Sequence, residues 1–302
     1  MASKLTLAQR QRQKLRERLI VGTLFAAAAS SVLITLGIVG VLLYESFEFF
    51  RHVRILDFLT DTQWTPLFAE PRYGMLPLLC GTLLSTVVAL AVAAPLGLTA
   101  ALYLSEFASP RTRETIKPIL ELLSGVPTVV YGFFALLFVT PLLQKLMPGL
   151  PGFNILSAGI VIGIMVIPYI ASLSEDAMRA VPQALRDGSL ALGATRFETA
   201  VRVVLPAAFS GIAAAFVLGI SRAVGETMVV AIAAGQQPNL TIDPREPAAT
   251  ITAFIVQVAL GDLPHGSIGY QSIFAVGLVL FLMTLSFNIF AFWLRRRYRE
   301  AY

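Results

Sequence analysis

Long apolar runs separated by short polar segments make up most of the chain. Six of them are long enough to cross a lipid bilayer, which takes about 20 residues of α-helix. They cover residues 19–44, 76–104, 118–142, 155–173, 207–234 and 272–294. A seventh run, at 248–260, has only 13 residues, so we expect an interfacial or re-entrant helix on the outer face. The pattern predicts an all-α polytopic membrane protein with six transmembrane helices.

Composition and charge support this interpretation. Of the 302 residues, 56% are hydrophobic and 14% are charged, which leaves too little polar surface to cover a soluble globule of this size. Seventeen Lys and Arg residues fall on one side of the predicted membrane and five on the other. Because basic segments stay in the cytoplasm, this bias places both termini there. The first run is longer than a signal peptide's apolar region, so we expect an uncleaved helix.

The predicted spans divide the chain into four parts. Residues 1–18 form a basic cytoplasmic tail, and residues 19–75 hold the first helix and an outer loop rich in aromatic residues. That loop would form an interfacial belt, or alternatively a docking surface for an external binding protein. Residues 76–290 form the transmembrane core, and residues 291–302 a second basic cytoplasmic tail.

A polar segment at 175–206 interrupts the core. Pro182 suits the start of a helix, and Gly193 can adopt the left-handed conformation that ends one. The segment therefore predicts two short helices meeting at Gly193, with Leu185, Leu190 and Leu192 as apolar anchors for a partner. An amphipathic loop resting on lipid is the alternative. Four arginines and four acids give zero net charge, which favours a protein partner because lipid-binding loops are basic.

Two charged residues lie inside the fifth predicted span. Arg222 and Glu226 would each cost about 2.5–3.5 kcal/mol at mid-membrane even on a lenient scale. Four residues apart, they would project from one helical face and pair. A guanidinium suits an anion's oxygens, so these residues are candidates for an anion pathway. An ion pair that only fixes helix packing is the alternative.

Pro127 lies inside the third predicted span, where we expect it to kink the helix. Ser124 and Thr128 are close enough to satisfy the freed backbone groups. A lining role for these two hydroxyls in the pathway is a weaker hypothesis.

The polar segment also resembles a known coupling loop. Asp187-Gly188-Ser189, Gly193 and Leu205-Pro206 match the spacing of the "EAA…G…LP" loop of permeases in binding-protein-dependent ABC importers, although Asp-Gly-Ser departs from Glu-Ala-Ala. The resemblance implies a type I (MetI-like) permease core whose loop docks onto an ATPase. The coupling residues it implies are Leu185, Asp187, Gly188, Ser189, Leu190, Leu192, Gly193, Leu205 and Pro206.

Further motifs resemble C-type permease subunits of bacterial phosphate importers (PstC-like). They are Trp64-Thr65-Pro66, the segment 73–77, the segment 122–132 and the segment 221–227. This resemblance implies phosphate passage at Arg222 and Glu226, and location in the bacterial cytoplasmic membrane. The implied partners are a homologous PstA-like permease subunit, two ABC ATPases and an external phosphate-binding protein. A-type subunits share related motifs, so the choice of C over A rests mainly on the first outer loop.

The sequence lacks the motifs of several enzyme classes. It has no Gly-x4-Gly-Lys-Ser/Thr motif, and its two histidines form no His-Glu-x-x-His pair. We therefore expect no cofactor, metal or nucleic acid on this chain, with ATP and magnesium bound by partner subunits. A permease for sulfate or molybdate, a gradient-driven transporter and a sensor scaffold without transport remain alternatives.

Overall fold

The computed structural model describes residues 7–66, 68 and 70–297, and within them the fold is helical. Two isolated bridges, Trp64 with Tyr73 and Gly235 with Ala248, are the only extended pairings among those residues. The long helices are α1 (Leu7–His52), α3 (Leu76–Leu102), α7 (Ile155–Arg179), α11 (Phe209–Val224) and α14 (Ile268–Arg297). The prediction of an all-α protein is confirmed.

Shorter helices connect these elements. They are α2 (Ile55–Thr60), α4 (Pro110–Ser124), α5 (Thr128–Phe134), α6 (Thr140–Leu146), α8 (Gln183–Ala191), α9 (Arg196–Thr199), α10 (Leu205–Ala207), α12 (Met228–Ala233) and α13 (Ile251–Ala259). Three single π-helical turns interrupt or extend them: η1 (Tyr103–Phe107), η2 (Ala135–Val139) and η3 (Ala200–Val204).

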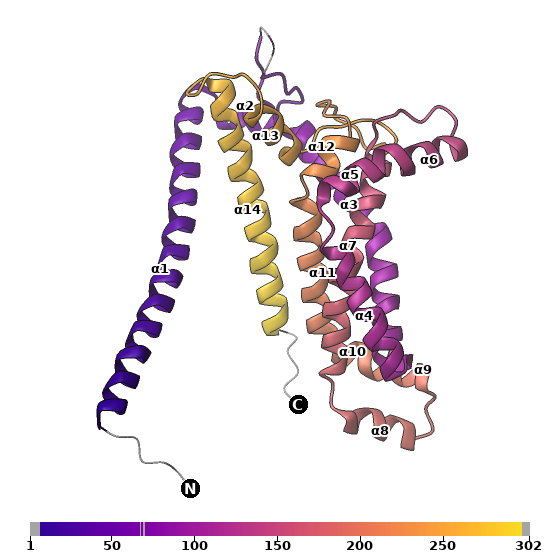
Figure 1. Ribbon diagram of the computed structural model, residues 1–302. Coiled ribbons are helices and arrows are strands. Elements are labelled where there is room, and N and C mark those ends of the chain that lie inside the picture. Colours follow the sequence, from indigo (N-terminus) through magenta and orange to yellow (C-terminus); the bar gives the residue numbers. More distant parts are fainter. Residues whose placement is uncertain (1–6, 67, 69, 298–302) are drawn as a thin grey trace.

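Five helical stretches in the described residues are long and apolar enough to cross a membrane. A sixth is obtained if 196–207 and α11, which meet at a bend of 72°, count as one span. The start of α1, the end of α14 and the pair α8 and α9 all lie at one end of the molecule (Figure 1). This arrangement matches the six crossings that the hydrophobic pattern predicts.

The core is built on the packing of α3 against α7. A Cβ atom placed on Gly163 would lie 2.7 Å from the carbonyl oxygen of Ala89, and one on Gly159 would lie 2.6 Å from Val88. Small residues let two helix backbones approach this closely, which gives dispersion contact and replaces the hydrophobic effect that is missing between helices in lipid. The largest cluster of buried apolar side chains surrounds this contact.

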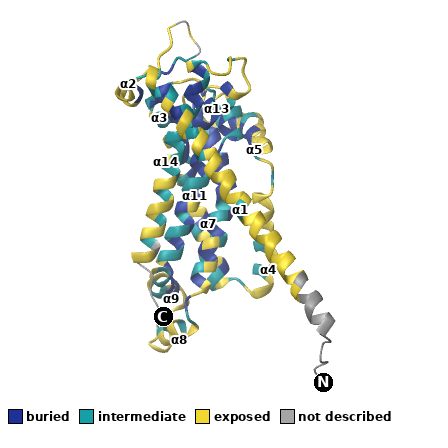
Figure 2. Cartoon of the chain, turned by 90° about the vertical axis from the view of Figure 1, so that its left-hand side faces the viewer, coloured by how far each residue is buried: buried dark blue, intermediate teal, exposed yellow. Residues whose placement is uncertain are grey.

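Helix α1 stands apart from this core along most of its length. None of the residues in its most apolar window is buried, and Figure 2 shows it as a continuous exposed helix. It contacts α14, and near its last turns Phe49 is fully buried in a second cluster with Phe58 and Trp64. The outer-loop aromatics therefore include a packed cluster that holds the end of α1 on the core.

The third span begins later than predicted. Residues 118–142 do not form one kinked helix, because α4 ends at Ser124 and Pro127 has extended backbone, with ψ 133°. Proline lacks an N–H and disfavours helical conformation in the residue before it, so the helix breaks here. The candidate span is Thr128–Leu146, and its last part, α6, projects sideways from the bundle (Figure 1).

The fifth span is also interrupted. The prediction of a continuous helix over 207–234 is wrong, since α11 ends at Val224 and α12 starts at Met228. Glu226 lies in the break, so it does not share a continuous helical face with Arg222. The 248–260 run forms the short helix α13, in which Ile251, Phe254 and Val258 are buried; its interfacial or re-entrant placement stays a prediction.

We expect Gly163→Val to destabilise the protein by about 1–3 kcal/mol, because the added side chain must push α3 and α7 apart. Gly37→Val is the matched control, since a Cβ at Gly37 in α1 meets nothing within 4 Å. Thermal unfolding of the detergent-purified variants should give a lower midpoint for the first and an unchanged midpoint for the second. Equal midpoints would contradict the tight packing described above.

Candidate functional site

The polar segment forms a compact projection, here called the knuckle (residues 182–206), at the same end of the molecule as the start of α1 and the end of α14. Pro182 precedes the first residue of α8, and Gly193 ends the helix with φ +89°. The N–H groups of Gly193 and Ala194 bond back to Leu190 and Ser189 at 3.0 and 3.2 Å, which is the Schellman pattern. The predicted glycine turn between two short helices is confirmed.

The second helix of the knuckle starts with a capping box that we had not predicted. The Thr195 hydroxyl accepts the Glu198 N–H at 3.2 Å, and the Glu198 carboxylate accepts the Thr195 N–H at 2.9 Å. The Thr-x-x-Glu spacing was a readable signal for it. The helix continues through η3 and α10 to Ala207 and meets α11 at a bend of 72°.

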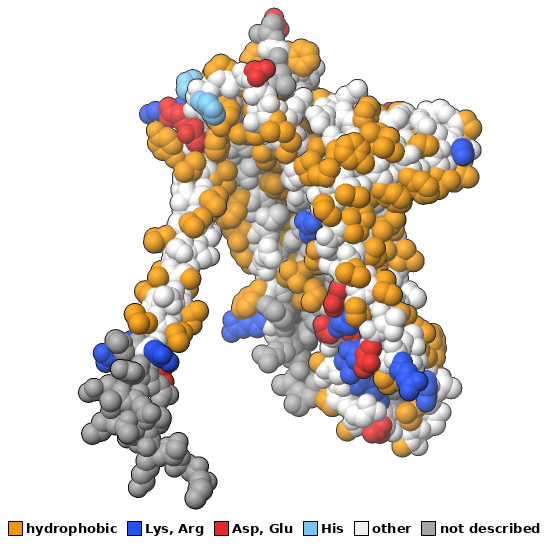
Figure 3. Space-filling model, in the orientation of Figure 1, with side chains coloured by type: hydrophobic (Ala, Val, Ile, Leu, Met, Phe, Trp, Pro, Cys, Tyr) orange, Lys and Arg blue, Asp and Glu red, His pale blue; other side chains and the backbone are white. Residues whose placement is uncertain are grey.

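The tip of the knuckle exposes apolar side chains. Leu192 is 91% exposed, Phe197 62% and Leu190 43%. Leu185 is 38% exposed, whereas Leu205 is partly buried against the core. Exposed apolar side chains on a rim of charges mark protein contact sites, and Figure 3 shows Lys, Arg, Asp and Glu gathered around this end of the molecule. Phe197 was missed because only the leucines were considered as anchors.

The remaining knuckle residues play local roles. Asp187 accepts a hydrogen bond from the Gln183 amide at 3.0 Å. The hydroxyls of Ser189 and Thr199 lie 3.0 Å apart, which ties α8 to the second helix. Gly188 is exposed on α8, and Pro206 is exposed on α10. Contact of these residues with an ATPase stays a prediction.

The predicted segment starts too early, because α7 continues to Arg179. Glu175 therefore belongs to the bundle, where it is fully buried and accepts Arg113 and Lys117 at 2.7 Å each. Both cations come from α4, so the buried carboxylate fastens α4 to α7. A buried charge is tolerated only when it is paired in this way. The partners are about sixty residues away in sequence, which explains why spacing gave no sign of them.

Arg222 and Glu226 meet at the end of α11. Arg222 Nη2 lies 3.8 Å from Glu226 Oε2, and its guanidinium carbon lies 6.0 Å from the ring centre of Tyr169 in α7. The side chain of Arg222 is 37% exposed, yet its Nε is buried with no hydrogen-bond partner. The expected pairing is found, although across a helix break rather than along one helix.

Glu226 also has a structural role. Its Oε1 accepts the N–H groups of Met228 and Val229 at 3.1 and 3.3 Å, so it caps α12. Its backbone carbonyl accepts the Thr252 hydroxyl from α13 at 2.7 Å. These bonds satisfy groups that the break leaves open, and they leave Oε2 directed to Arg222. Sequence spacing could not reveal Thr252, which is 26 residues away.

The other candidate pathway residues flank the earlier break. Ser124 is the last residue of α4 and donates to its own helix, to Glu121 O at 2.6 Å. Thr128 is the first residue of α5. The Tyr131 hydroxyl donates to Leu123 O at 2.7 Å across the break, so it satisfies a backbone group that we had assigned to Ser124 and Thr128. Their lining role stays a prediction.

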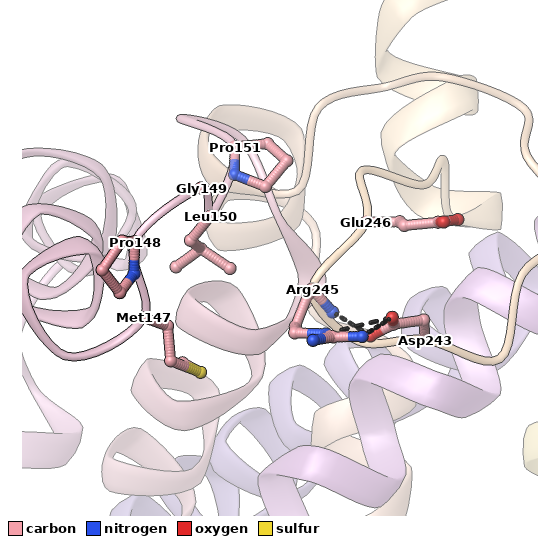
Figure 4. Close-up of a pocket in the computed structure, with 8 residues that line it drawn as sticks. All are labelled: Met147, Pro148, Gly149, Leu150, Pro151, Asp243, Arg245 and Glu246. Atoms are coloured by element: carbon pink, nitrogen blue, oxygen red, sulfur yellow. Dashed lines mark hydrogen bonds and ion pairs between the residues drawn. The ribbon is translucent and has the colours of Figure 1, made fainter.

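A separate pocket lies at the opposite end from the knuckle. It is formed by the loop 147–151 and by Asp243, Arg245 and Glu246 (Figure 4). Arg245 bonds Asp243 at 2.6 Å, and these hydrogen bonds hold the pKa of Asp243 at about 2. Because that ion pair is internal and exposed, the pocket offers no free charge for an anion.

Comparison with known proteins identifies the class to which this fold and site belong. The profile of the family described as "Binding-protein-dependent transport system inner membrane component" matches residues 93–300. The chain belongs to this family, and it is thus a transmembrane permease component of the ABC transporter type rather than an enzyme.

Three named permease proteins are similar to this chain over most of their length. A probable ABC transporter permease protein, YqgH of Bacillus subtilis, is 36% identical over 291 residues, covering 95% of this chain and 93% of the relative. The phosphate transport system permease protein PstC of Mesorhizobium japonicum is 32% identical over 280 residues, with 85% and 84% covered. PstC 1 of Mycobacterium tuberculosis is 35% identical over 280 residues, with 80% and 82% covered.

Solved structures confirm the permease fold. A bacterial alginate ABC transporter, in complex with an alginate pentasaccharide-bound periplasmic protein, contains a chain with TM-score 0.66 and 18% identity, covering 96% of this chain and 98% of that one. A chain of the MetNI methionine ABC transporter, in an inward-facing conformation, gives TM-score 0.54 and 18% identity, with 75% and 95% covered. At such identities the likeness shows the fold alone, and the predicted MetI-like core is confirmed.

We expect Thr252→Val to destabilise the protein by about 1–3 kcal/mol, because it leaves the buried Glu226 carbonyl unsatisfied while keeping the shape of the side chain. Thr252→Ser keeps the hydroxyl and should lose less. Thermal unfolding of the purified variants tests the difference. If the valine variant unfolds at the same temperature as the serine variant, the hydrogen bond does not stabilise the break.

Proposed function

We propose that this chain is the permease subunit of an ATP-driven importer that carries inorganic phosphate across the bacterial cytoplasmic membrane. It would pair with a homologous PstA-like subunit, bind two ATPases and receive phosphate from an external binding protein. Both termini would face the cytoplasm. The chain itself would hold no cofactor, because ATP and magnesium belong to the ATPases.

The observation that carries the proposal is the incompletely paired guanidinium of Arg222. Its Nε is a buried donor without a partner, although its side chain is 37% exposed. Buried polar groups almost always have a partner, and a planar guanidinium binds phosphate oxygens in a bidentate manner. Similarity to PstC proteins supports phosphate over other anions.

The neighbouring carboxylate supports the same choice on chemical grounds. Phosphate near neutral pH carries a P–OH group, which donates a hydrogen bond, whereas sulfate is fully ionised and only accepts. Glu226 Oε2 lies 3.8 Å from the guanidinium, so the pair presents donors and an acceptor side by side. A carboxylate is an acceptor when ionised, and it therefore favours an oxyanion that still holds a proton.

The knuckle would transmit the work of the ATPases. Its exposed apolar tip suits a groove on a partner protein, and its second helix runs through η3 and α10 and meets α11 at a bend of 72°. Closing of two ATPases around ATP would draw the knuckles together and rock the helices between inward-facing and outward-facing states. Arg222 lies at the far end of α11, so motion of the knuckle reaches the proposed phosphate contact.

We expect Arg222→Gln to reduce phosphate uptake by about 10- to 100-fold, since the charged hydrogen bonds to the anion are lost. Uptake of labelled phosphate by cells whose only phosphate importer contains the variant is the measurement. Arg111→Gln is the control, because Arg111 is exposed on α4. Wild-type flux in Arg222→Gln with an assembled complex removes Arg222 from the pathway. Competition by unlabelled sulfate as strong as by phosphate would reassign the substrate.

We expect Gly193→Val to weaken recovery of the ATPase subunits with the tagged permease, because φ +89° at Gly193 strains any side chain by about 1–2 kcal/mol and distorts the tip. Gly266→Val is a matched control, since Gly266 has φ +83° at the other end of the molecule. Equal ATPase recovery from both variants would count against docking at the knuckle. Phosphate transport by the permease alone in liposomes would instead indicate a gradient-driven carrier.

A further inference from the structure

One ion pair joins the knuckle to the transmembrane bundle at its base. Arg186, in α8, donates Nε to Glu106 Oε2 at 3.1 Å and Nη2 to Glu106 Oε1 at 2.9 Å. Glu106 lies in the π-helical turn η1, which extends α3. The pairing is bidentate, which fixes the relative orientation of the two side chains as well as their distance.

The same guanidinium also bonds the end of α7. Arg186 Nη1 donates to Val181 O at 2.6 Å, and Nη2 donates to Met178 O at 2.9 Å. Met178 lies in the last turn of α7 and Val181 lies just beyond its end. The Met178 carbonyl also accepts the Val181 N–H at 3.2 Å, so Arg186 adds a side-chain bond to the close of that helix. One side chain of α8 is therefore bonded to both of the helices that form the core of the bundle.

The side chain of Arg186 is less exposed than that of Arg179, another arginine of the segment. The side chains of Arg186 and Glu106 are 12% and 10% exposed. Arg179, by contrast, is 46% exposed and lies 3.7 Å from its acid partner, Glu175. Removal of one member of a mostly buried ion pair leaves the other charged group without that partner, whereas an exposed pair at longer distance contributes little.

We propose that Arg186 and Glu106 form a clamp that makes α8 move as one body with α3 and α7. Arg186 is in this sense a positioning residue, which transmits displacement of the knuckle to the bundle rather than touching the substrate. The inference rests on the proposed function. The clamp would add a second route from the knuckle to Arg222, beside the route through α11. This second route runs through α7, which carries Tyr169, whose ring faces the Arg222 guanidinium.

The chain connection between α7 and α8 does not by itself fix the orientation of α8. The chain between Arg179, the last residue of α7, and Gln183, the first of α8, is short but contains Val181 and Pro182 in non-helical conformation. Without the clamp, α8 could pivot about this connection while α7 stays in place. The bidentate bond to η1 supplies the second fixed point that a rigid body needs.

The test compares ATP hydrolysis with phosphate uptake in proteoliposomes that contain the full complex and the binding protein. Arg186→Lys keeps the charge but loses the fork, and Glu106→Gln keeps the shape but loses the charge. In each variant we expect hydrolysis within about twofold of wild type and uptake lowered about tenfold, so ATP consumed per phosphate rises. The double variant should be no worse than either single variant, because both remove one interaction. Arg179→Gln is the matched control and should behave as wild type.

Two outcomes overturn the clamp. Unchanged ATP consumed per phosphate in both single variants shows that the pair transmits nothing. Parallel loss of hydrolysis, uptake and ATPase recovery in Arg186→Lys, but not in Glu106→Gln, shows that Arg186 contacts the ATPase instead. Absence of phosphate uptake in the wild-type complex is a failure of the proposed function and not of the clamp.

A distance measurement that does not depend on transport separates failure of the clamp from failure of the proposed function. Spin labels at Gly188→Cys in α8 and Leu96→Cys in α3, in a Cys80→Ser background, report the distance between knuckle and bundle. Both labelled positions are exposed. Arg186→Lys should broaden this distance distribution about twofold in the absence of ATP, because α8 then pivots. An unchanged distribution contradicts the clamp whatever the transported solute.

Discussion

Backbone hydrogen bonding inside hydrocarbon is the constraint on which the structure depends. A peptide group without a partner costs several kcal/mol there, so a helix can be interrupted only where other groups replace the missing bonds. Two breaks in this bundle, at 125–127 and 225–227, meet the requirement. At 125–127 the Tyr131 hydroxyl donates a hydrogen bond to the Leu123 carbonyl. At 225–227 the Glu226 side chain caps α12, and the Thr252 hydroxyl donates to the Glu226 carbonyl. The charged pair therefore sits where the helix is already open.

The two breaks are also joined by packing. A Cβ on Gly132 in α5 would lie 2.7 Å from Ile232 and 3.2 Å from the Met228 carbonyl in α12. Close approach of the two short helices lets each cover the other's interrupted end, and α13 covers the same region from the other side. Close packing of these short helices takes the place of a continuous helix at the break beside Arg222. Irregular backbone is tolerated in membranes when it is buried in protein in this manner.

Sequence reasoning worked where local chemistry decides the structure. The long spans follow from apolar runs, and Gly193 ends α8 because few other residues accept its conformation. It failed where tertiary contacts decide. Pro127 can kink or break a helix, and the contacts that accompany the break, such as the Tyr131 hydroxyl on the Leu123 carbonyl, have no signature in local sequence. Arg186 and Glu106 are 80 residues apart, so nothing local marks them as partners.

Helix α1 differs from the rest of the bundle in how its sequence is constrained. The family profile begins at residue 93, and α1, which precedes it, buries none of its most apolar window. Only its last turns, around Phe49, pack into the aromatic cluster. Apart from its contact with α14, the rest of its length is exposed, so within this chain hydrophobicity and length constrain its sequence more than packing does. Apolar side chains on that exposed stretch are therefore interchangeable as far as packing within this chain is concerned.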